Sequence, residues 1–127
     1  MNSAKVKAAP DEAMEIEGAL GVCLVDYQSG MTLGTAGGDG LNLEMAAAGT
    51  TEVVRSKLRV MGALGLDDRI EDVLITLGTQ YHLIRMVKDT DSHFLYMALN
   101  KGLSNLGIAK FQLSSVERKL SRAGHGR

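Results

Sequence analysis

The sequence has few of the residue types that build disulfides and aromatic sites. Its 127 residues include one cysteine, one proline, no tryptophan, three tyrosines and two phenylalanines. Because Cys23 is the lone cysteine, an intramolecular disulfide is excluded. The first residues contain no apolar stretch typical of a signal peptide. We therefore expect a reducing, cytoplasmic location.

Charge is balanced, and long hydrophobic runs are missing. Fourteen Lys and Arg residues stand against 15 Asp and Glu residues, which gives a formal net charge of −1. This balance does not favour the broad basic surface that nucleic-acid binding requires, so we expect a protein partner and no nucleic acid. The nearly uncharged segments 19–25 and 46–51 are much shorter than the roughly 18 residues that span a bilayer. We expect no membrane contact.

Motifs for binding phosphates or metals are not found. No glycine is followed by lysine, which excludes a P-loop. The glycine-rich segment 34–40 lacks the dinucleotide-binding spacing and places Asp39 where an anion would lie. The histidines His82, His93 and His125 lack the usual spacing of zinc ligands. A pair formed by His82 and His93 across neighbouring strands remains open, although surface or partly buried histidines are expected.

No set of residues suggests catalysis. Cys23 lies among apolar residues with no charged neighbour that would lower its pKa, so it is expected to be a small buried hydrophobic residue. The acidic clusters at 11–17 and 67–72 lie at the ends of predicted elements, where carboxylates act as solvated caps. We therefore expect no enzyme, no catalytic residue, no cofactor and no metal.

The hydrophobic pattern divides the chain into one domain of ordinary size. We expect a flexible N-terminus over residues 1–9, a domain over 10–120, and a flexible basic tail over 121–127. The predicted elements are a helix over 10–18, strands Ala19–Asp26 and Met31–Ala36, a helix from Leu43 to about Leu64, strands Ile70–Leu77, Tyr81–Lys88 and His93–Leu99, and an amphipathic helix from Leu106 to Leu120.

The long central helix has an unusually wide apolar face. Asn42 is a good N-cap for it, and Gly65 is a good C-terminal stop. At 100° per residue its apolar side chains cover an arc of about 160°, wider than the stripe of an ordinary surface helix. We expect that a single sheet does not cover the whole of such an arc. Lys57 falls inside this arc, where it can lie along apolar surface or reach an acidic partner.

Several segments together resemble the roadblock/dynein light chain family, in its bacterial branch. They are the hairpin 18–31 with its following glycine-rich loop, the helix end 62–66, and the strand pair 72–77 and 81–87. The resemblance covers about residues 11 to 120 and rests on element order. It implies an α+β, profilin-like fold in the order α-β-β-α-β-β-β-α. The five-stranded antiparallel sheet has the order 2-1-5-4-3, with the central helix on one face and the terminal helices on the other.

The same resemblance implies self-association. Family members form homodimers or heterodimers in which the third strands pair edge to edge and the central helices lie side by side. This arrangement accounts for the wide apolar arc and protects the exposed edge strand. The expected dimer interface comprises Val54, Leu58, Met61, Val73, Leu74 and Ile75.

The resemblance also implies a non-catalytic role with small Ras-like GTPases. In the bacterial gliding-motility system, a dimer of this kind stimulates its GTPase without inserting an arginine finger. We therefore expect a homodimeric module that binds and regulates, or scaffolds, such a GTPase through Lys57, Val53 and Val60. Two alternatives remain open. One is a small-ligand sensor, and the other is an adaptor beside a histidine-kinase-like protein.

Overall fold

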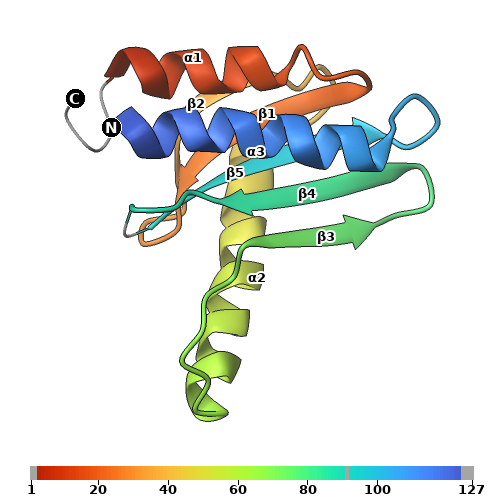
Figure 1. Cartoon of the computed structure of the whole chain (residues 1–127). Helices are drawn as coiled ribbons and strands as arrows, with labels where there is room; N and C mark the ends of the chain where they lie inside the picture. Colours follow the sequence, from red (N-terminus) through yellow and green to blue (C-terminus); the bar gives the residue numbers. More distant parts are fainter. Residues whose placement is uncertain (1–2, 91, 124–127) are drawn as a thin grey trace.

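The computed structural model describes residues 3–90 and 92–123. The chain forms three helices and five strands in the predicted order (Figure 1). The elements are α1 (Ser3–Ala13), β1 (Ala19–Asp26), β2 (Met31–Gly37), α2 (Leu43–Ala63), β3 (Asp72–Thr76), β4 (Gln80–Met86), β5 (His93–Asn100) and α3 (Leu106–Ala123).

The strands form one antiparallel sheet in the order β2-β1-β5-β4-β3, which confirms the predicted order. The apolar runs of β1 and β5 are buried on both faces because these strands lie at the centre of the sheet. β3 is shorter than predicted. Its pairing with β4 runs from Asp72 opposite Arg85 to Thr76 opposite Tyr81.

Helices cover both faces of the sheet, as predicted, and a hydrophobic cluster fills each interface. α1 and α3 pack on one face, where Leu83, Leu95 and Leu113 are fully buried. α2 packs on the other face, where its Val54 lies against a cluster that includes Ile84 and Phe94. The alternation of side chains along each strand supplies both clusters from one sheet.

The first helix differs from its prediction. It begins at Ser3, so residues 3–9 are helical, and it ends at Ala13. Pro10 lies inside the helix and is buried with Ala9 against the sheet, so packing outweighs the missing amide of proline. At the other end of the chain, α3 extends to Ala123. The remainder of the predicted tail lies outside the described residues.

α2 extends beyond the sheet that supports it. Its start is fixed by Asn42, whose side chain accepts a hydrogen bond of 3.0 Å from the Met45 amide. Gly65, with φ +69°, follows its end as predicted. Figure 1 shows that the N-terminal half of α2 lies behind the sheet, whereas its C-terminal half projects past the edge strand β3.

Candidate interaction surface at strand β3 and helix α2

β3 is an edge strand with unpaired backbone groups. Leu77 donates its amide to the Gln80 carbonyl at 2.8 Å, and Met86 donates to the Glu71 carbonyl at 3.1 Å. Because hydrogen-bonded pairs alternate along an antiparallel ladder, the amides and carbonyls of Asp72, Leu74 and Thr76 point away from β4. Among the described residues, no strand pairs with this outer edge.

The side chains along this edge are apolar. Leu74, Ile75 and Leu77 are exposed large hydrophobic residues, whereas Val73 is half-buried against the α2 cluster. Natural proteins usually protect such an edge with charge, proline or a cover, because unpaired apolar strands associate. The edge is therefore a candidate site for pairing with another strand.

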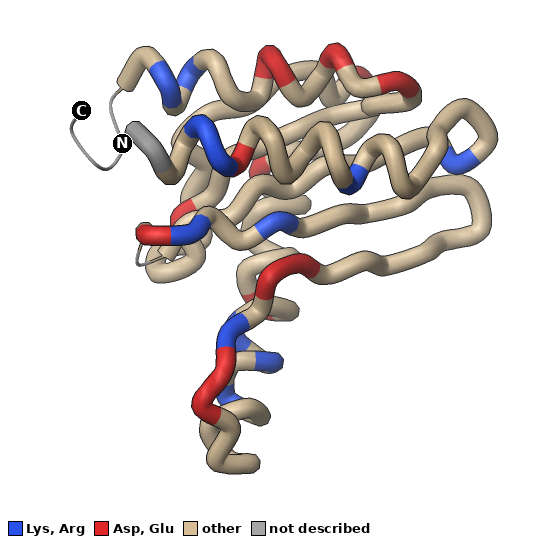
Figure 2. Tube along the Cα trace, viewed as in Figure 1, with Lys and Arg blue, Asp and Glu red and all other residues tan. Residues whose placement is uncertain are grey.

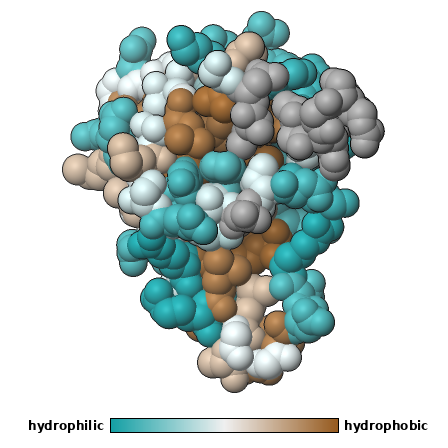
Figure 3. Space-filling view, turned by 90° about the vertical axis from the view of Figure 1, so that its left-hand side faces the viewer, coloured by the Kyte–Doolittle hydropathy of each residue, from teal (hydrophilic) through white to brown (hydrophobic). Residues whose placement is uncertain are grey.

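The apolar arc of α2 divides into a buried half and an exposed half. Leu43, Ala47, Val54 and Met61 face the sheet or the segment after the helix and are buried. The exposed half contains large apolar side chains that we call the α2 stripe: Val53, Val60 and Leu64. Figure 3 shows apolar surface over the projecting part of the molecule, with hydrophilic surface on both sides.

Burial within the single chain divides the residues predicted for the dimer interface into two groups. Val54 and Met61 are buried within their own chain, and Leu58 and Val73 are half-buried. Leu74 and Ile75 lie on the exposed edge. The residues predicted to bind a partner, Lys57, Val53 and Val60, are exposed on α2. Sequence reasoning did not assign Met45, Leu64, Leu66 or Leu77 to a site, although each is exposed.

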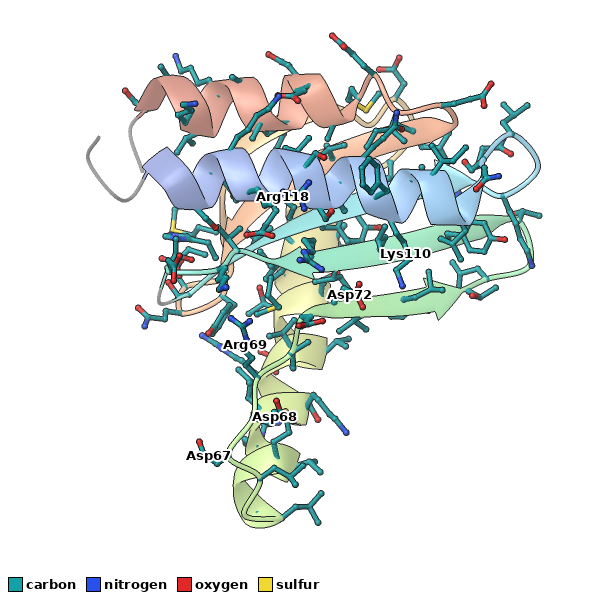
Figure 4. The ribbon with its side chains drawn as sticks, viewed as in Figure 1. Asp67, Asp68, Arg69, Asp72, Lys110 and Arg118 are labelled. Atoms are coloured by element: carbon teal, nitrogen blue, oxygen red, sulfur yellow. The ribbon has the colours of Figure 1, made fainter. Side chains whose placement is uncertain are left out.

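An ionic network fixes β3 to its neighbours on the face opposite α2. Figure 4 shows Lys110 of α3 reaching toward Asp72 of β3, with Nζ 3.7 Å from Oδ2. Arg85 of β4 lies 3.8 Å from the same carboxylate and donates through Nε to Glu117 Oε1 at 3.2 Å. Glu117 Oε2 accepts from the Lys88 amide at 3.1 Å and from Ser121 Oγ at 2.7 Å. Glu117 is thus a buried carboxylate with every oxygen engaged.

His82 forms a local network on the opposite face from these ions. Its Nδ1 lies 3.2 Å from the Tyr96 hydroxyl and its Nε2 lies 2.7 Å from Gln80 Oε1. Burial lowers the pKa of His82 and raises the pKa of Tyr96 to about 12. The open possibility of a His82–His93 pair is wrong, because the register places His82 opposite Ala98 and His93 opposite Asp26.

The geometry of the described residues points to no further chemical site. Cys23 is fully buried, as predicted, and burial raises the pKa of its thiol to about 12. Within residues 3–90 and 92–123, no three metal-ligating side chains come together. Clefts of about 220 and 350 Å³ lie at the end of the sheet near Arg85 and Glu117, and most of their polar lining is charged. The helices of the described chain are too short or too polar to cross a bilayer.

Comparisons with known proteins find similarity in structure. No family model and no curated sequence matches the chain. MglB from Myxococcus xanthus superposes with a TM-score of 0.86 at 16% identity, covering 98% of this chain and 91% of that chain. The gliding protein MglB from Thermus thermophilus gives a TM-score of 0.82 at 14% identity, covering 98% and 92%. A Roadblock/LC7 domain from Streptomyces avermitilis gives a TM-score of 0.76 at 11% identity, covering 92% and 95%.

These superpositions extend over nearly the whole of each chain, so the shared arrangement is that of the complete domain. The element order, the strand order and the position of the helices agree with the family resemblance predicted from the sequence. The chain therefore has the Roadblock/LC7 fold.

Proposed function

We propose that this protein is a non-catalytic, cytoplasmic homodimer that binds and regulates, or scaffolds, a small Ras-like GTPase in bacterial signalling. The observation that carries the proposal is the unpaired apolar edge of β3 beside the exposed α2 stripe. The similarity in fold to MglB, a gliding protein, supports the same class of role.

Pairing of β3 with the β3 of a second copy would continue the sheet across both chains. The outward amides and carbonyls of Asp72, Leu74 and Thr76 would then find partners, and the apolar side chains of the edge would leave water. The projecting halves of the two α2 helices would lie beside one another.

The GTPase is proposed to dock on α2 near Lys57, with Val53 and Val60 as neighbouring apolar contacts. An exposed lysine beside aliphatic side chains suits a protein surface that combines an acidic group with apolar residues. This assignment does not require a catalytic side chain from the dimer. It assigns the hydrolytic chemistry to the GTPase.

A tagged pull-down from source-cell lysate, read by mass spectrometry, tests this function. It is run with GDP and with a non-hydrolysable GTP analogue. We expect a Ras-like GTPase in the eluate, with recovery that depends on the nucleotide. Its absence in both states would overturn the proposal, and recovery of a histidine-kinase-like protein alone would favour the adaptor alternative.

Charge reversal on α2 then tests the docking face with the purified GTPase. Lys57→Glu is expected to weaken binding at least tenfold, because one contact becomes repulsive. Arg59→Glu is the matched control, since Arg59 is also exposed on α2 but lies on its charged side. Equal losses in both variants would show that net charge matters and would remove Lys57 from the site.

A further inference from the structure

Three large apolar side chains remain exposed at the start of α3, on the face of the sheet opposite α2. Ile108 and Phe111 of α3 are 56% and 68% exposed, and Leu103, in the turn that leads into the helix, is 65% exposed. None of the three belongs to either core cluster. Single exposed apolar residues are ordinary, but a group with an aromatic member is typical of interaction sites. We call these three residues the α3 patch.

A groove between α1 and α3 runs past this patch. α1 and α3 lie side by side (Figure 1), and clefts of about 90 and 250 Å³ lie between them. The larger cleft is lined by Glu15 and Ile16 on the α1 side and by Gln112 and Ser115 of α3. Ile108 precedes Gln112 by one turn and therefore lies beside this cleft. Two helices packed side by side leave a groove in which a third helix can lie.

The α1 side of this groove is acidic beside the patch. Figure 2 shows the acidic residues at the end of α1 and in the turn that follows, next to the start of α3. Glu17 lies close to that start, because Ser104 Oγ lies 3.3 Å from its carbonyl oxygen. Glu12 pairs with Lys119. Among the described residues, neither Glu15 nor Glu17 takes part in an ion pair.

The basic residues near the patch lie elsewhere. Lys110 points toward β3, with Nζ 3.7 Å from the Asp72 carboxylate, and Lys101 Nζ lies 5.7 Å from the centre of a tyrosine ring on β4. Arg118 follows Phe111 by two turns, and its guanidinium donates to two serine hydroxyls of its own helix. The surface is therefore acidic on the α1 side of the patch, and its cations lie toward β3 and β4 or farther along α3.

We propose that the α3 patch and its groove bind an amphipathic helix of a different protein, one that carries lysine or arginine beside its apolar face. The apolar face of that helix covers Ile108 and Phe111, which are the anchors of the contact. Its cations lie over Glu15 and Glu17, whose carboxylates have no ionic partner in the described part of the chain. Such a helix supplies both the apolar cover and the positive charge that this surface calls for.

This site is separate from the surface proposed to bind the GTPase. α3 packs on the opposite face of the sheet from α2, so a helix on the α3 patch does not cover α2. Binding of the helix also does not depend on the β3 edge or on Lys57. Phe111→Ser should therefore leave the proposed dimer and its GTPase binding unchanged, and failure of the α3 site would not affect the proposed function.

Fluorescence anisotropy with two designed helical peptides tests the site. Both peptides carry leucines along one face, and the positions beside that face are lysine in one peptide and glutamate in the other. We expect the wild-type chain to bind the lysine peptide at least tenfold more tightly than the glutamate peptide at about 0.15 M salt. Equal affinities for the two peptides, or binding of neither, would overturn the proposal.

Substitutions with matched controls locate the binding. Phe111→Ser should weaken binding of the lysine peptide at least tenfold, whereas Met31→Ser, which removes a similarly exposed apolar side chain from β2, should change it less than about twofold. Glu15→Lys should weaken it at least fivefold. Asp67→Lys makes the same change of charge in the exposed segment after α2 and is its control. Equal losses within either pair would overturn the assignment.

Sedimentation velocity of the free chain distinguishes a helix of another protein from a second copy as the occupant. Wild type and Phe111→Ser should sediment with the same mass, because the patch does not contact another copy. Circular dichroism should show the same helix content in both, since Phe111 lies outside the core clusters. A smaller mass for Phe111→Ser than for wild type would assign the patch to a second copy and overturn the proposal.

Discussion

At the scale of single residues, Glu117 is the buried charge that most depends on its neighbours. Glu117→Gln keeps the shape of the side chain but removes the charge that faces Arg85, which is itself partly buried. The substitution leaves Arg85 with only the Asp72 carboxylate, 3.8 Å away, and weakens the hydrogen bonds that Glu117 accepts from Lys88 and Ser121. We expect the free energy of unfolding in urea to fall by about 3 kcal/mol.

Glu12→Gln is the control for this experiment. Glu12 pairs with Lys119 at a more exposed position, where an ion pair contributes at most about 1 kcal/mol. Both variants replace one glutamate by glutamine, but the glutamate at position 117 is buried and the one at position 12 is more exposed. Equal stability losses would show that burial does not decide the contribution of Glu117.

The buried thiol of Cys23 should make the free energy of unfolding depend on pH in the alkaline range. Burial raises the pKa of its thiol from 9.0 to about 12 in the folded chain. Between these values the unfolded chain releases the proton and the folded chain keeps it, so stability is complete below pH 9 and falls as pH rises. From pH 9 to 10.5 this thiol should remove about 2 kcal/mol.

Cys23→Ala separates this loss from other titrations. The variant is less stable at neutral pH because it loses buried volume. Its deficit relative to the wild type should shrink as pH rises, because the wild type alone carries the thiol and both chains share Tyr96. Urea denaturation at pH 7, 9 and 10.5 measures the deficit. A constant deficit would contradict the raised pKa.

At the scale of secondary-structure elements, β3 offers a backbone test of self-association. Leu74→Pro removes an outward amide, and proline is tolerated on an edge strand when its nitrogen faces away from the sheet. The domain should therefore stay folded while β3–β3 pairing loses a hydrogen bond and meets the proline ring. We expect the dimer dissociation constant to rise at least 100-fold, measured by sedimentation equilibrium.

Leu74→Ala is the matched control for the proline variant. It keeps the amide and shortens the same side chain, so the dissociation constant should rise less than about tenfold. A proline variant as dimeric as the alanine variant would show that the outer edge of β3 is not the contact. A change in the circular dichroism spectrum would instead indicate damage to the sheet itself.

The elements also show how far the sequence could predict this structure. Strand Ala19–Asp26 and helix Leu43–Ala63 follow directly from a continuous apolar run and from a capped periodic pattern. Helix α1 was misplaced because proline was interpreted as a helix start, whereas the buried contacts of Ala9 and Pro10 hold the helix through it.

The predicted interaction site was harder to define, because burial depends on the crossing of α2 over the sheet. The 160° arc contained both Val54, which is buried, and Val60, which is exposed, and local periodicity alone cannot separate them. The assignment of β3 as an edge required the strand order. That order came from the family resemblance, since a sequence pattern does not fix which strands are neighbours.

At the scale of the whole molecule, the projecting half of α2 connects folding to self-association. Figure 1 shows this part of the helix beyond the sheet, and Val60 and Leu64 remain exposed on it. Most helical stability in proteins comes from packing of an apolar face. In a single chain this half has little to pack against, so a second copy would stabilise it.

The midpoint of urea unfolding should therefore depend on protein concentration. For a dimer that unfolds to two chains, raising the concentration 100-fold stabilises the folded state by about 2.7 kcal/mol per mole of dimer. We expect this shift in the wild type between roughly 1 and 100 µM chain, monitored by circular dichroism, and almost none in Leu74→Pro. Coincident wild-type curves would contradict a dimer that supports α2. A shift in wild type that survives in the proline variant would instead assign the stabilising contact to a surface other than the β3 edge.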